Sequence, residues 1–345
     1  MLRTFWWLTS SLAAPALLVL ACGSDPVEVE GPNASPTTTT GGTTPTPTAP
    51  SRPDAAAPDA DAGLVDKPIH FLALGDTGKG NDEARAVAKA MSEKCKKAPC
   101  DFAILLGDNI YSSGASSPDD PQFQTKFEQI YTDVNLDFQV VLGNHDYGGE
   151  GLGIEFGKAK NEIDYTLKSK KWKLPAAYYQ FSKGSRDFFV LDTNLVMHDR
   201  ADTQKEDIDK WLAASKATWK IALGHHPYLS NGKHGNAGSY DGLPFVPILN
   251  GKRIKDYLED HVCGKVDVYF AGHDHSLQWL NSTCKGTVLA VSGSGSESTT
   301  LSNTNPTAFQ TLSNGFIYVT IDGRTLTAEF IDKDGISLHT ETLKK

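Results

Sequence analysis

The order of secondary-structure patterns from residue 66 onward predicts a mixed-sheet α/β domain, with two stacked β-sheets and helices on the outside. Short apolar runs, typical of buried strands, alternate with helix-period patterns as far as residue 275. After residue 286 only strand and turn patterns occur, and no internal repeat is visible. This change from alternation to consecutive strands is the pattern that favours two sheets.

The expected elements follow in chain order. Strands are predicted at 69–76, 101–109 and 138–146, separated by a helix at 81–95 that Asn81 caps and a helix at 123–134. The apolar runs at 178–182 and 186–193 are typical of a hairpin, and a helix at 203–215, a strand at 219–227, a helix at 252–262 and a strand at 266–275 come next. The final strands are expected at 286–295, 315–323 and 325–335.

The first 65 residues have a different composition. Residues 1–22 contain a short apolar run, too short for a membrane span, that predicts a signal peptide. Its end, Val19 to Cys22, resembles a bacterial lipobox, with a plain secretory signal as the alternative; Gly23 and Ser24 then favour sorting to the outer membrane. Residues 23–65 are rich in Pro, Thr and Ala and predict a disordered tether, which leaves 66–345 as the folded domain.

Charge and cysteine content narrow the class of protein. The chain carries a net charge of −9 and its first 65 residues carry −4, so residues 66–345 carry −5. A mildly acidic domain without a basic cluster argues against nucleic acid as a partner. Four cysteines remain after Cys22, and in an exported chain they predict disulfides. Three pairings are possible; Cys95 with Cys100 and Cys263 with Cys284 are favoured because they are neighbours in sequence.

Five of the predicted strands end in the same way, with a glycine followed by a residue that can bind a metal. Open α/β sheets place their ligands beyond the carboxyl ends of strands, and a glycine lets the backbone turn sharply there. A single Gly-Asp at a strand end is usually a turn, but five such ends in one chain predict a metal site. The pairs are Gly75-Asp76, Gly107-Asp108, Gly143-Asn144, Gly224-His225 and Gly272-His273.

These motifs resemble the purple acid phosphatases, of the small tartrate-resistant acid phosphatase type, within the calcineurin-like metallophosphoesterase superfamily. The resemblance runs from Phe71 to Asp332 through the ordered set GD, GDNxY, GNHD, GHxP and GHDHxLQ. It implies a metallophosphoesterase-like four-layer α/β/β/α sandwich with two mixed sheets. It also implies a dinuclear metal centre. Many relatives have histidine where this chain has Gly78, and here Tyr111 replaces that ligand, which is the purple acid phosphatase pattern.

The resemblance assigns a role to each site residue. The first metal is expected at Asp76, Tyr111 and His275 and the second at Asn144, His225 and His273, with Asp108 bridging. Two carboxylates and a phenolate favour Fe(III) at the first position, whereas imidazoles and an amide suit Fe(II), Zn(II) or Mn(II) at the second. The family's substrate-contacting histidines match His145, which Asp146 is expected to orient, and His234. Asp274 is expected only to order its turn.

The implied activity is an acid phosphatase that hydrolyses phosphate monoesters by attack of a metal-bound hydroxide, either bridging or terminal. The alternatives are a phosphodiesterase or nucleotide pyrophosphatase on the same scaffold, and an idle phosphate-binding lipoprotein. Small phosphorylated substrates are the expected partners, with membrane contact only through lipid at Cys22. We expect an exported monomer, either an outer-membrane lipoprotein or a periplasmic or extracellular protein.

Several other features receive structural interpretations. The remaining histidines, His70, His198, His226, His261 and His339, are expected at the surface or in packing. The Gly/Ser-rich stretch 292–300 lacks the lysine of a phosphate-binding loop and is expected to be a flexible loop at the rim of the cleft. Residues 194–203 are too few for the inhibitory loop of the mammalian-type enzymes.

Overall fold

The computed structural model describes residues 66–243, 245–246 and 249–345. The predicted signal peptide and tether lie outside the described residues. Within the part that is described, no helix has the length and apolar character needed to cross a membrane.

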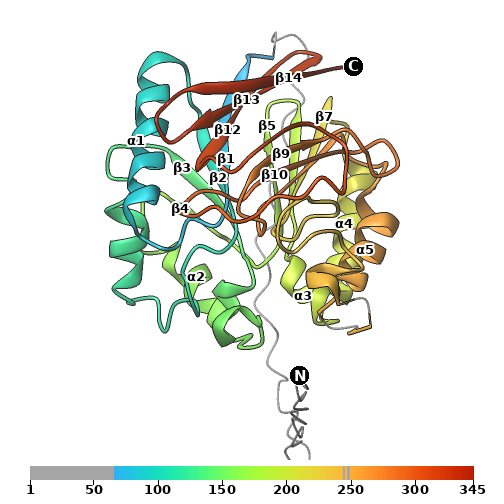
Figure 1. Cartoon of the computed structure of the whole chain (residues 1–345), viewed down its shortest axis with the longest axis horizontal. Helices are drawn as coiled ribbons and strands as arrows, with labels where there is room; N and C mark the ends of the chain where they lie inside the picture. The colour runs from blue at the N-terminus through green and yellow to red at the C-terminus, as the bar shows by residue number, and fades with distance from the viewer. Residues whose placement is uncertain (1–65, 244, 247–248) are drawn as a thin grey trace, which may run out of the picture. The chain divides into compact units, whose positions relative to one another are not determined.

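Two seven-stranded mixed sheets form the domain, and both run through its centre in Figure 1. The order is β14-β13-β12-β1-β2-β3-β4 in the first sheet and β11-β9-β10-β8-β7-β6-β5 in the second. In the first sheet β1 to β4 are parallel and β12 to β14 antiparallel. The bounds in the first sheet are β1 (Ile69–Leu74), β2 (Phe102–Leu106), β3 (Asp137–Val141), β4 (Trp172–Lys173), β12 (Gly315–Asp322), β13 (Thr325–Asp332) and β14 (Ser337–Lys344).

The second sheet is also mixed, because β6, β7, β8 and β10 are parallel while β5, β9 and β11 pair antiparallel. Its strands are β5 (Tyr179–Lys183), β6 (Arg186–Val190), β7 (Trp219–Leu223), β8 (Val268–Ala271), β9 (Leu277–Leu280), β10 (Val288–Ser292) and β11 (Thr307–Thr311). The β5–β6 pair is the predicted hairpin.

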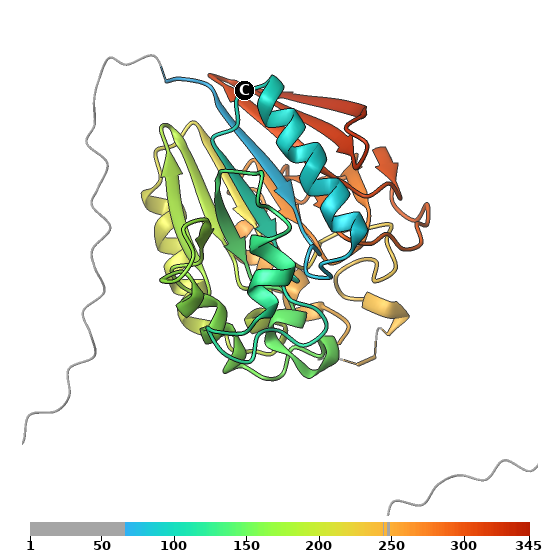
Figure 2. The ribbon, with the colours of Figure 1, turned by 90° about the vertical axis from the view of Figure 1, so that its left-hand side faces the viewer.

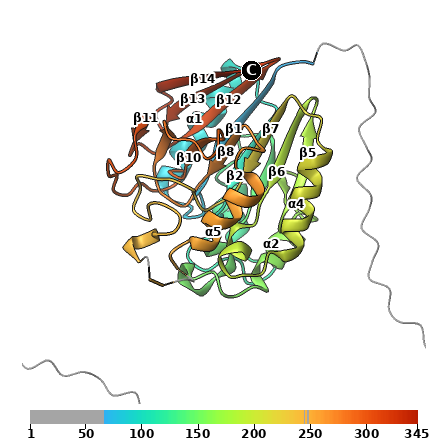
Figure 3. The same cartoon turned by 90° about the vertical axis from the view of Figure 1, so that its right-hand side faces the viewer.

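Helices cover the outer faces of both sheets. The long helix α1 (Asp82–Lys97) lies over the first sheet in Figure 2, and α4 (Asp202–Ala214) and α5 (Lys252–Tyr257) lie over the second in Figure 3. The shorter α2 (Lys158–Tyr165) and α3 (Thr193–Met197) follow strands of the first and second sheet. The Asn81 side chain caps α1 by accepting a hydrogen bond from the Ala84 amide at 3.1 Å, as predicted. The layers confirm the predicted α/β/β/α sandwich.

The short helical turns correct two predicted helices. The segment 123–134 contains a π-helix at Gln124–Glu128 bounded by turns, and α5 continues into a second π-helix at Leu258–Val262. Short 3₁₀ turns occur at His145–Tyr147, Gly149–Gly151 and Tyr240–Gly242. The first correction places residues 129–133 in turns, where the backbone leads toward β3.

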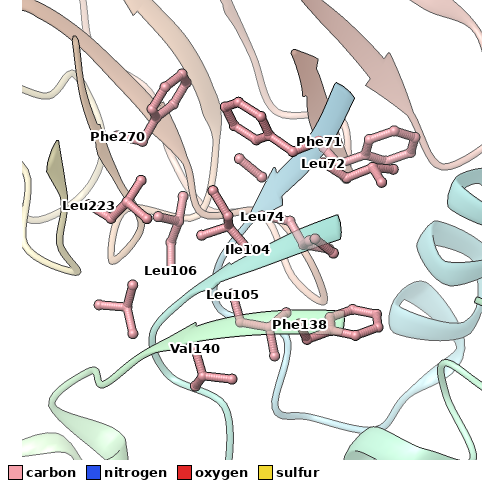
Figure 4. Packing of buried hydrophobic residues seen from close by; sticks show 14 of the residues in the cluster. Phe71, Leu72, Leu74, Ile104, Leu105, Leu106, Phe138, Val140, Leu223 and Phe270 are labelled. Atoms are coloured by element: carbon pink, nitrogen blue, oxygen red, sulfur yellow. The ribbon is translucent and has the colours of Figure 1, made fainter. Parts of the chain in front are cut away.

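Buried aromatic and aliphatic side chains fill the space between the sheets. Figure 4 shows Phe71 of β1 and Phe270 of β8 on facing strands, and their ring centroids lie 6.2 Å apart in an edge-to-face arrangement. All five residues of β2 are buried, as expected of a parallel strand covered on both faces. This packing fixes the positions of the parallel strands, so the loops at their carboxyl ends are held on a rigid support.

Both favoured disulfides are present. Cys95 and Cys100 join the end of α1 to the approach to β2, with Cα atoms 5.4 Å apart. Cys263 and Cys284 join the segment before β8 to the segment before β10, with Cα atoms 5.3 Å apart. The structure therefore selects one of the three pairings that the sequence allowed.

Asp66 connects the first described residues to the second sheet. Its carboxylate forms an ion pair with the guanidinium of Arg186, which is fully buried in β6, and accepts a hydrogen bond from the Ser185 amide at 3.1 Å. Arg186 also donates to the Ile321 carbonyl at 3.1 Å. Leaving a buried guanidinium without its carboxylate partner destabilises a protein, so we infer that Asp66 contributes to the stability of the domain.

A protein consisting of residues 66–345 is therefore expected to keep full activity and thermal stability. In that protein, Asp66→Ala should lower the free energy of unfolding by about 2 kcal/mol, less than for a fully buried pair because the Asp66 side chain is 34% exposed. The corresponding fall in Tm is about 4 °C, measured by thermal unfolding. Asp119→Ala, which removes an exposed ion pair with Lys168, is the control and should change Tm little. Equal Tm values for the two variants would contradict the role of Asp66.

Candidate metal centre

Seven side chains with metal-binding atoms meet beyond the carboxyl ends of the parallel strands. They come from both sheets, and each is buried or nearly so. Every ligand that the sequence predicted is therefore in this cluster. They are Asp76 after β1, Asp108 and Tyr111 after β2, Asn144 after β3, His225 after β7, and His273 and His275 after β8.

The first group of donors consists of Asp76, Tyr111 and His275. The Tyr111 hydroxyl lies 2.9 Å from Asp76 Oδ1 and 3.1 Å from His275 Nε2. His275 Nε2 lies 3.4 Å from the same Asp76 oxygen. The other Asp76 oxygen accepts a hydrogen bond from the His273 amide at 2.8 Å, so only one carboxylate oxygen faces the group.

The second group consists of Asn144, His225 and His273, with Asp108 beside it. His225 Nε2 lies 2.9 Å from Asn144 Oδ1, 3.1 Å from His273 Nδ1 and 3.3 Å from Asp108 Oδ1. Asp108, His225 and His273 each offer one ligand atom, and these three atoms lie within 4.8 Å of one another, so the three residues could hold a metal ion. Burial is the main reason that the pKa of the Tyr111 phenol is raised, and the nearby Asp108 carboxylate raises that pKa further, so this carboxylate stands between the two groups.

The hydrogen bonds around the second group leave acceptor atoms facing one another. His225 Nδ1 is 2.8 Å from the Leu106 carbonyl and must donate to it, which leaves the Nε2 lone pair for the cluster. The Asn144 amide nitrogen donates to the Gly151 carbonyl, so its oxygen also faces the cluster. Lone pairs from oxygen and imidazole nitrogen at this spacing require a cation or a proton between them.

The pKa values of the histidines follow from the same crowding. Burial lowers the pKa of His225, but the Asp108 carboxylate opposes it and the net effect raises the pKa to about 9. Burial, with the imidazoles around it, lowers the pKa of His273 well below its ordinary value. Positive charge next to Asp108 is therefore electrostatically favoured, and a bound metal cation would supply that charge. The donor set fits a dinuclear centre.

Three of the seven residues have left-handed backbone conformations, which are uncommon without glycine. The φ angles are 58° at Asp76, 54° at Asp108 and 69° at His273. Each such residue costs about 1–3 kcal/mol unless its surroundings offset the strain. Strained backbone conformations are often found at functional sites. Here the left-handed conformation turns the side chains toward the cluster immediately after the strands end.

Two glycines show why the motif requires them. Gly107 has φ 94°, and a Cβ there would lie 2.5 Å from His225 Nδ1. A Cβ at Gly143 would lie 2.2 Å from Asp108 Oδ1. Any side chain at either position would displace a predicted ligand.

Gly78 explains why tyrosine replaces histidine as a ligand. A Cβ at Gly78 would lie 2.3 Å from the carbonyl carbon of Asn109, so no side chain can start from this position without moving the backbone of the Asp108 loop. Tyr111, three residues after Asp108, reaches the Asp76 oxygen instead. The loss of one ligand and the gain of the other are thus parts of the same packing arrangement.

His145 lies beside Asp108 with one nitrogen directed toward the cluster. Its Nδ1 is 2.6 Å from the Ser112 carbonyl, so Nδ1 carries a proton, and its Nε2 is 4.0 Å from Asp108 Oδ2. The ring lies 4.4 Å from the Tyr111 ring, centroid to centroid. The contact with Ser112 fixes Nε2 as the atom that can exchange a proton with a bound molecule.

The expected orientation of His145 by Asp146 requires correction. Asp146 is fully buried and its carboxylate accepts hydrogen bonds from the amides of Asn109, Ile110 and Gly143 at 2.7–3.0 Å. These bonds join the loops after β2 and β3. The imidazole of His145 takes its orientation from the Ser112 carbonyl, and Asp146 acts on the loops that carry the ligands.

A second buried carboxyl group, Asp192, predicts a pH effect on stability. Asp192 caps α3 through the Leu195 amide and accepts a hydrogen bond from the Tyr147 hydroxyl. Burial is the main reason that its pKa is raised to about 7. The folded protein therefore holds a proton that the unfolded chain has lost between about pH 4 and pH 7, so this group's contribution to stability falls as pH rises through that window.

The expected loss from this group is up to about 4 kcal/mol across the window. Denaturant unfolding at a series of pH values should show a shallower fall for Asp192→Asn, which keeps the shape and removes the titration. Parallel curves for the variant and the wild type would contradict the prediction.

His234 lies on the side of the second group and is held by two aspartates. Its Nδ1 is 2.8 Å from Asp241 Oδ1, and its amide donates to Asp274 Oδ1 at 2.8 Å. The His234 and His273 rings stack at 4.2 Å. The Asp274 carboxylate was expected only to order its own turn, but it accepts hydrogen bonds from the amides of His234 and Gly235 and so holds the loop that carries His234. The sequence analysis missed Asp241, whose only signal is an acidic residue in a loop near a predicted site histidine.

The remaining histidines have packing roles, with one qualification. His226 is buried, its Nδ1 lies 2.8 Å from Thr193 Oγ1, and its ring lies 4.5 Å from the His273 ring. His226 therefore packs against the ring of His273, a predicted metal ligand. The others contact neighbours away from the cluster, as expected: His70 with Asp101, His198 with the Leu152 carbonyl, His261 with Asp209 and His339 with Glu341.

Comparisons with known proteins agree with this geometry. The model of the Calcineurin-like phosphoesterase family matches residues 69–277. Purple acid phosphatase 7 of Arabidopsis thaliana is 33% identical over 258 residues, with 67% of this chain and 71% of that protein covered. The chain belongs to the purple acid phosphatase family.

Two further proteins are similar to this chain. Tartrate-resistant acid phosphatase type 5 of Sus scrofa is 29% identical over 312 residues, covering 78% of this purple acid phosphatase chain and 85% of the pig protein. A solved structure described as GAP50, the anchor in the inner membrane complex of Plasmodium, superposes with a TM-score of 0.64 at 21% identity, covering 80% and 89% of the two chains. That similarity supports the fold alone.

Proposed function

We propose that this purple acid phosphatase family member is an exported acid phosphatase that hydrolyses phosphate monoesters at a dinuclear metal centre. The observation that carries the proposal is the pair of donor groups that meet on the two sides of Asp108. We assign Asp76, Tyr111 and His275 to the first metal and Asn144, His225 and His273 to the second. Two cations held there would bind a phosphate group between them and acidify a coordinated water.

The donor types suggest the metals. The first group offers carboxylate and phenol oxygens, hard donors that favour Fe(III), and the second offers neutral imidazoles and an amide, which suit Fe(II), Zn(II) or Mn(II). We propose this iron-containing pair as the cofactor. The family relationship supports a dinuclear centre, and we infer the identity of each metal from the donors.

The chain's own groups would complete the reaction. Because His145 Nδ1 donates to the Ser112 carbonyl, Nε2 can hold the proton that the departing alcohol oxygen needs. His234 would donate to a phosphate oxygen, with Asp241 holding its ring in place. A histidine that must be protonated to work favours activity on the acid side of neutrality.

Elemental analysis combined with a panel of phosphoesters tests the proposal. The purified protein should contain two metal ions per chain, including iron, and should hydrolyse monoesters faster than diesters or pyrophosphates. Preferential cleavage of diesters or nucleotide pyrophosphates would favour the alternative activity on the same scaffold. A full complement of metal without hydrolysis of any ester would instead identify a phosphate-binding protein without catalysis.

We also propose that the protein is exported as a monomer and carries lipid at Cys22, with residues 23–65 as a tether. The two disulfides support export, because such bonds persist in oxidising compartments. In a bacterial host, labelled palmitate should be incorporated into the wild type and should be absent from Cys22→Ser. Release of both proteins into the medium in equal amounts would leave an ordinary signal peptide.

A further inference from the structure

The segment 292–300, expected to be a flexible rim loop, is instead fixed to the residues that carry the first donor group. Ser292, Ser294 and Ser296 are fully buried. The Gly295 amide donates to the Gly75 carbonyl at 3.0 Å, and the Thr299 amide donates to the His275 carbonyl at 3.1 Å. This segment is therefore part of the wall of the first metal position, and its side chains are candidates for a role there.

Glu297 is the charged residue of this segment, and it contacts His275. Its Oε2 lies 3.2 Å from His275 Nδ1, while His275 Nε2 faces Asp76 and Tyr111 on the opposite side of the ring. Nδ1 is buried and forms no regular hydrogen bond in the described part of the chain, so Glu297 is the group placed to accept its proton. The Lys79 ammonium contacts the same Glu297 oxygen from the loop after β1.

We propose that Glu297, held in place by Lys79, is a positioning residue for His275 at the first metal position. This inference rests on the proposed function, because it concerns the metal that His275 would bind. A carboxylate that accepts the Nδ1 proton keeps Nε2 available as a donor and fixes the ring orientation. Its negative charge also makes the imidazole a stronger donor, which stabilises a trivalent ion relative to a divalent one.

The charge of Glu297 has consequences that differ from those of a structural contact. Glu297→Gln keeps the size of the side chain and removes its charge. Iron should then leave to a chelator about 10–100-fold faster, the usual effect of losing a partner of a metal-binding histidine. The reduction potential of the first iron should rise, and the phenolate-to-iron absorption band should move to longer wavelength, because both changes follow from weaker donation to Fe(III).

The test compares the iron-loaded full-length wild type, Glu297→Gln, Glu297→Asp and a matched control. Glu93→Gln serves as the control because Glu93 also pairs with a lysine and its side chain is 39% exposed, against 40% for Glu297. Only Glu297→Gln should change the iron-loss rate, the potential and the band, and Glu297→Asp should restore part of each. Thermal unfolding of the metal-free proteins should give similar Tm values for all four.

The outcomes separate this inference from the proposed function. An iron-containing, active wild type with a Glu297→Gln variant of the same band, potential and iron-loss rate would overturn the role of Glu297 and leave the proposed function standing. A lower Tm for metal-free Glu297→Gln with an unchanged potential would identify a structural contact and would also overturn it. A wild type that binds no metal would overturn both.

Discussion

Asp108→Ala is expected to lose metal from both positions and to lose nearly all phosphatase activity. Asp108 lies between the two donor groups, 3.3 Å from His225 Nε2 and close enough to Tyr111 to raise the pKa of the phenol. A carboxylate shared by both metals contributes to two coordination shells. Its loss should therefore reduce kcat/KM by more than about 100-fold, the upper end of what residues around the metal ligands cost. Metal content and kinetics on one monoester measure the effect.

The control for this substitution is Asp256→Ala, an exposed aspartate on α5 that pairs with Lys252. It should keep metal and activity. Asp108 also accepts a hydrogen bond from the His145 amide at 2.9 Å, so its loss could disturb the local structure. Circular dichroism must therefore show that Asp108→Ala is folded. A folded variant with normal metal content would refute the bridging assignment.

Tyr111→Phe is expected to remove the colour of the protein while the fold remains. A phenolate bound to Fe(III) gives a charge-transfer band, so the wild type should be pink to violet. The Tyr111 hydroxyl is also the atom nearest to both Asp76 and His275 in the first group, so its loss should weaken iron binding and lower activity about 10–100-fold. The visible spectrum and iron content measure the result.

Tyr178→Phe provides the comparison, since the Tyr178 hydroxyl donates a hydrogen bond to Asp207 of α4, away from the cluster. That variant should keep the wild-type band. A wild type that is colourless, free of iron and most active at alkaline pH would place a divalent ion at the first position. The iron assignment would then be withdrawn, although the metallophosphoesterase family would still hold.

Five of the seven donors could be found because each directly follows the glycine that ends an apolar run, a local pattern that needs no knowledge of the fold. Tyr111 and His275 do not follow a glycine directly and were identified through the resemblance to the purple acid phosphatases. The residues around the donors lack such a signal. Asp241 meets His234 only through a turn in the loop between them, and Glu297 reaches His275 because β10 lies beside β8. Such contacts depend on how strands pair, and composition alone described the Glu297 segment as flexible.

The fold, like the site, could be predicted only where a local sequence pattern marks it. The alternation of apolar runs located the parallel strands at both sheet centres, since those strands are buried on both faces. It did not locate β14, an edge strand whose side chains are largely exposed and whose polar sequence has no apolar face to detect. The π-helical turns at Gln124–Glu128 and Leu258–Val262 also lack a periodic signal that separates them from α-helix.

The left-handed backbone at Asp76, Asp108 and His273 limits how this centre can evolve. Aspartate, asparagine, histidine and glycine accept that conformation more readily than other residues, and β-branched residues accept it least. Glutamate, cysteine or tyrosine at these three positions would face a backbone cost before any change in metal preference could be selected. Tyr111, Asn144, His225 and His275 are outside the set of positive-φ residues. Lineages that acquire a different metal should therefore differ first at these four positions, and the three left-handed ones should remain as they are.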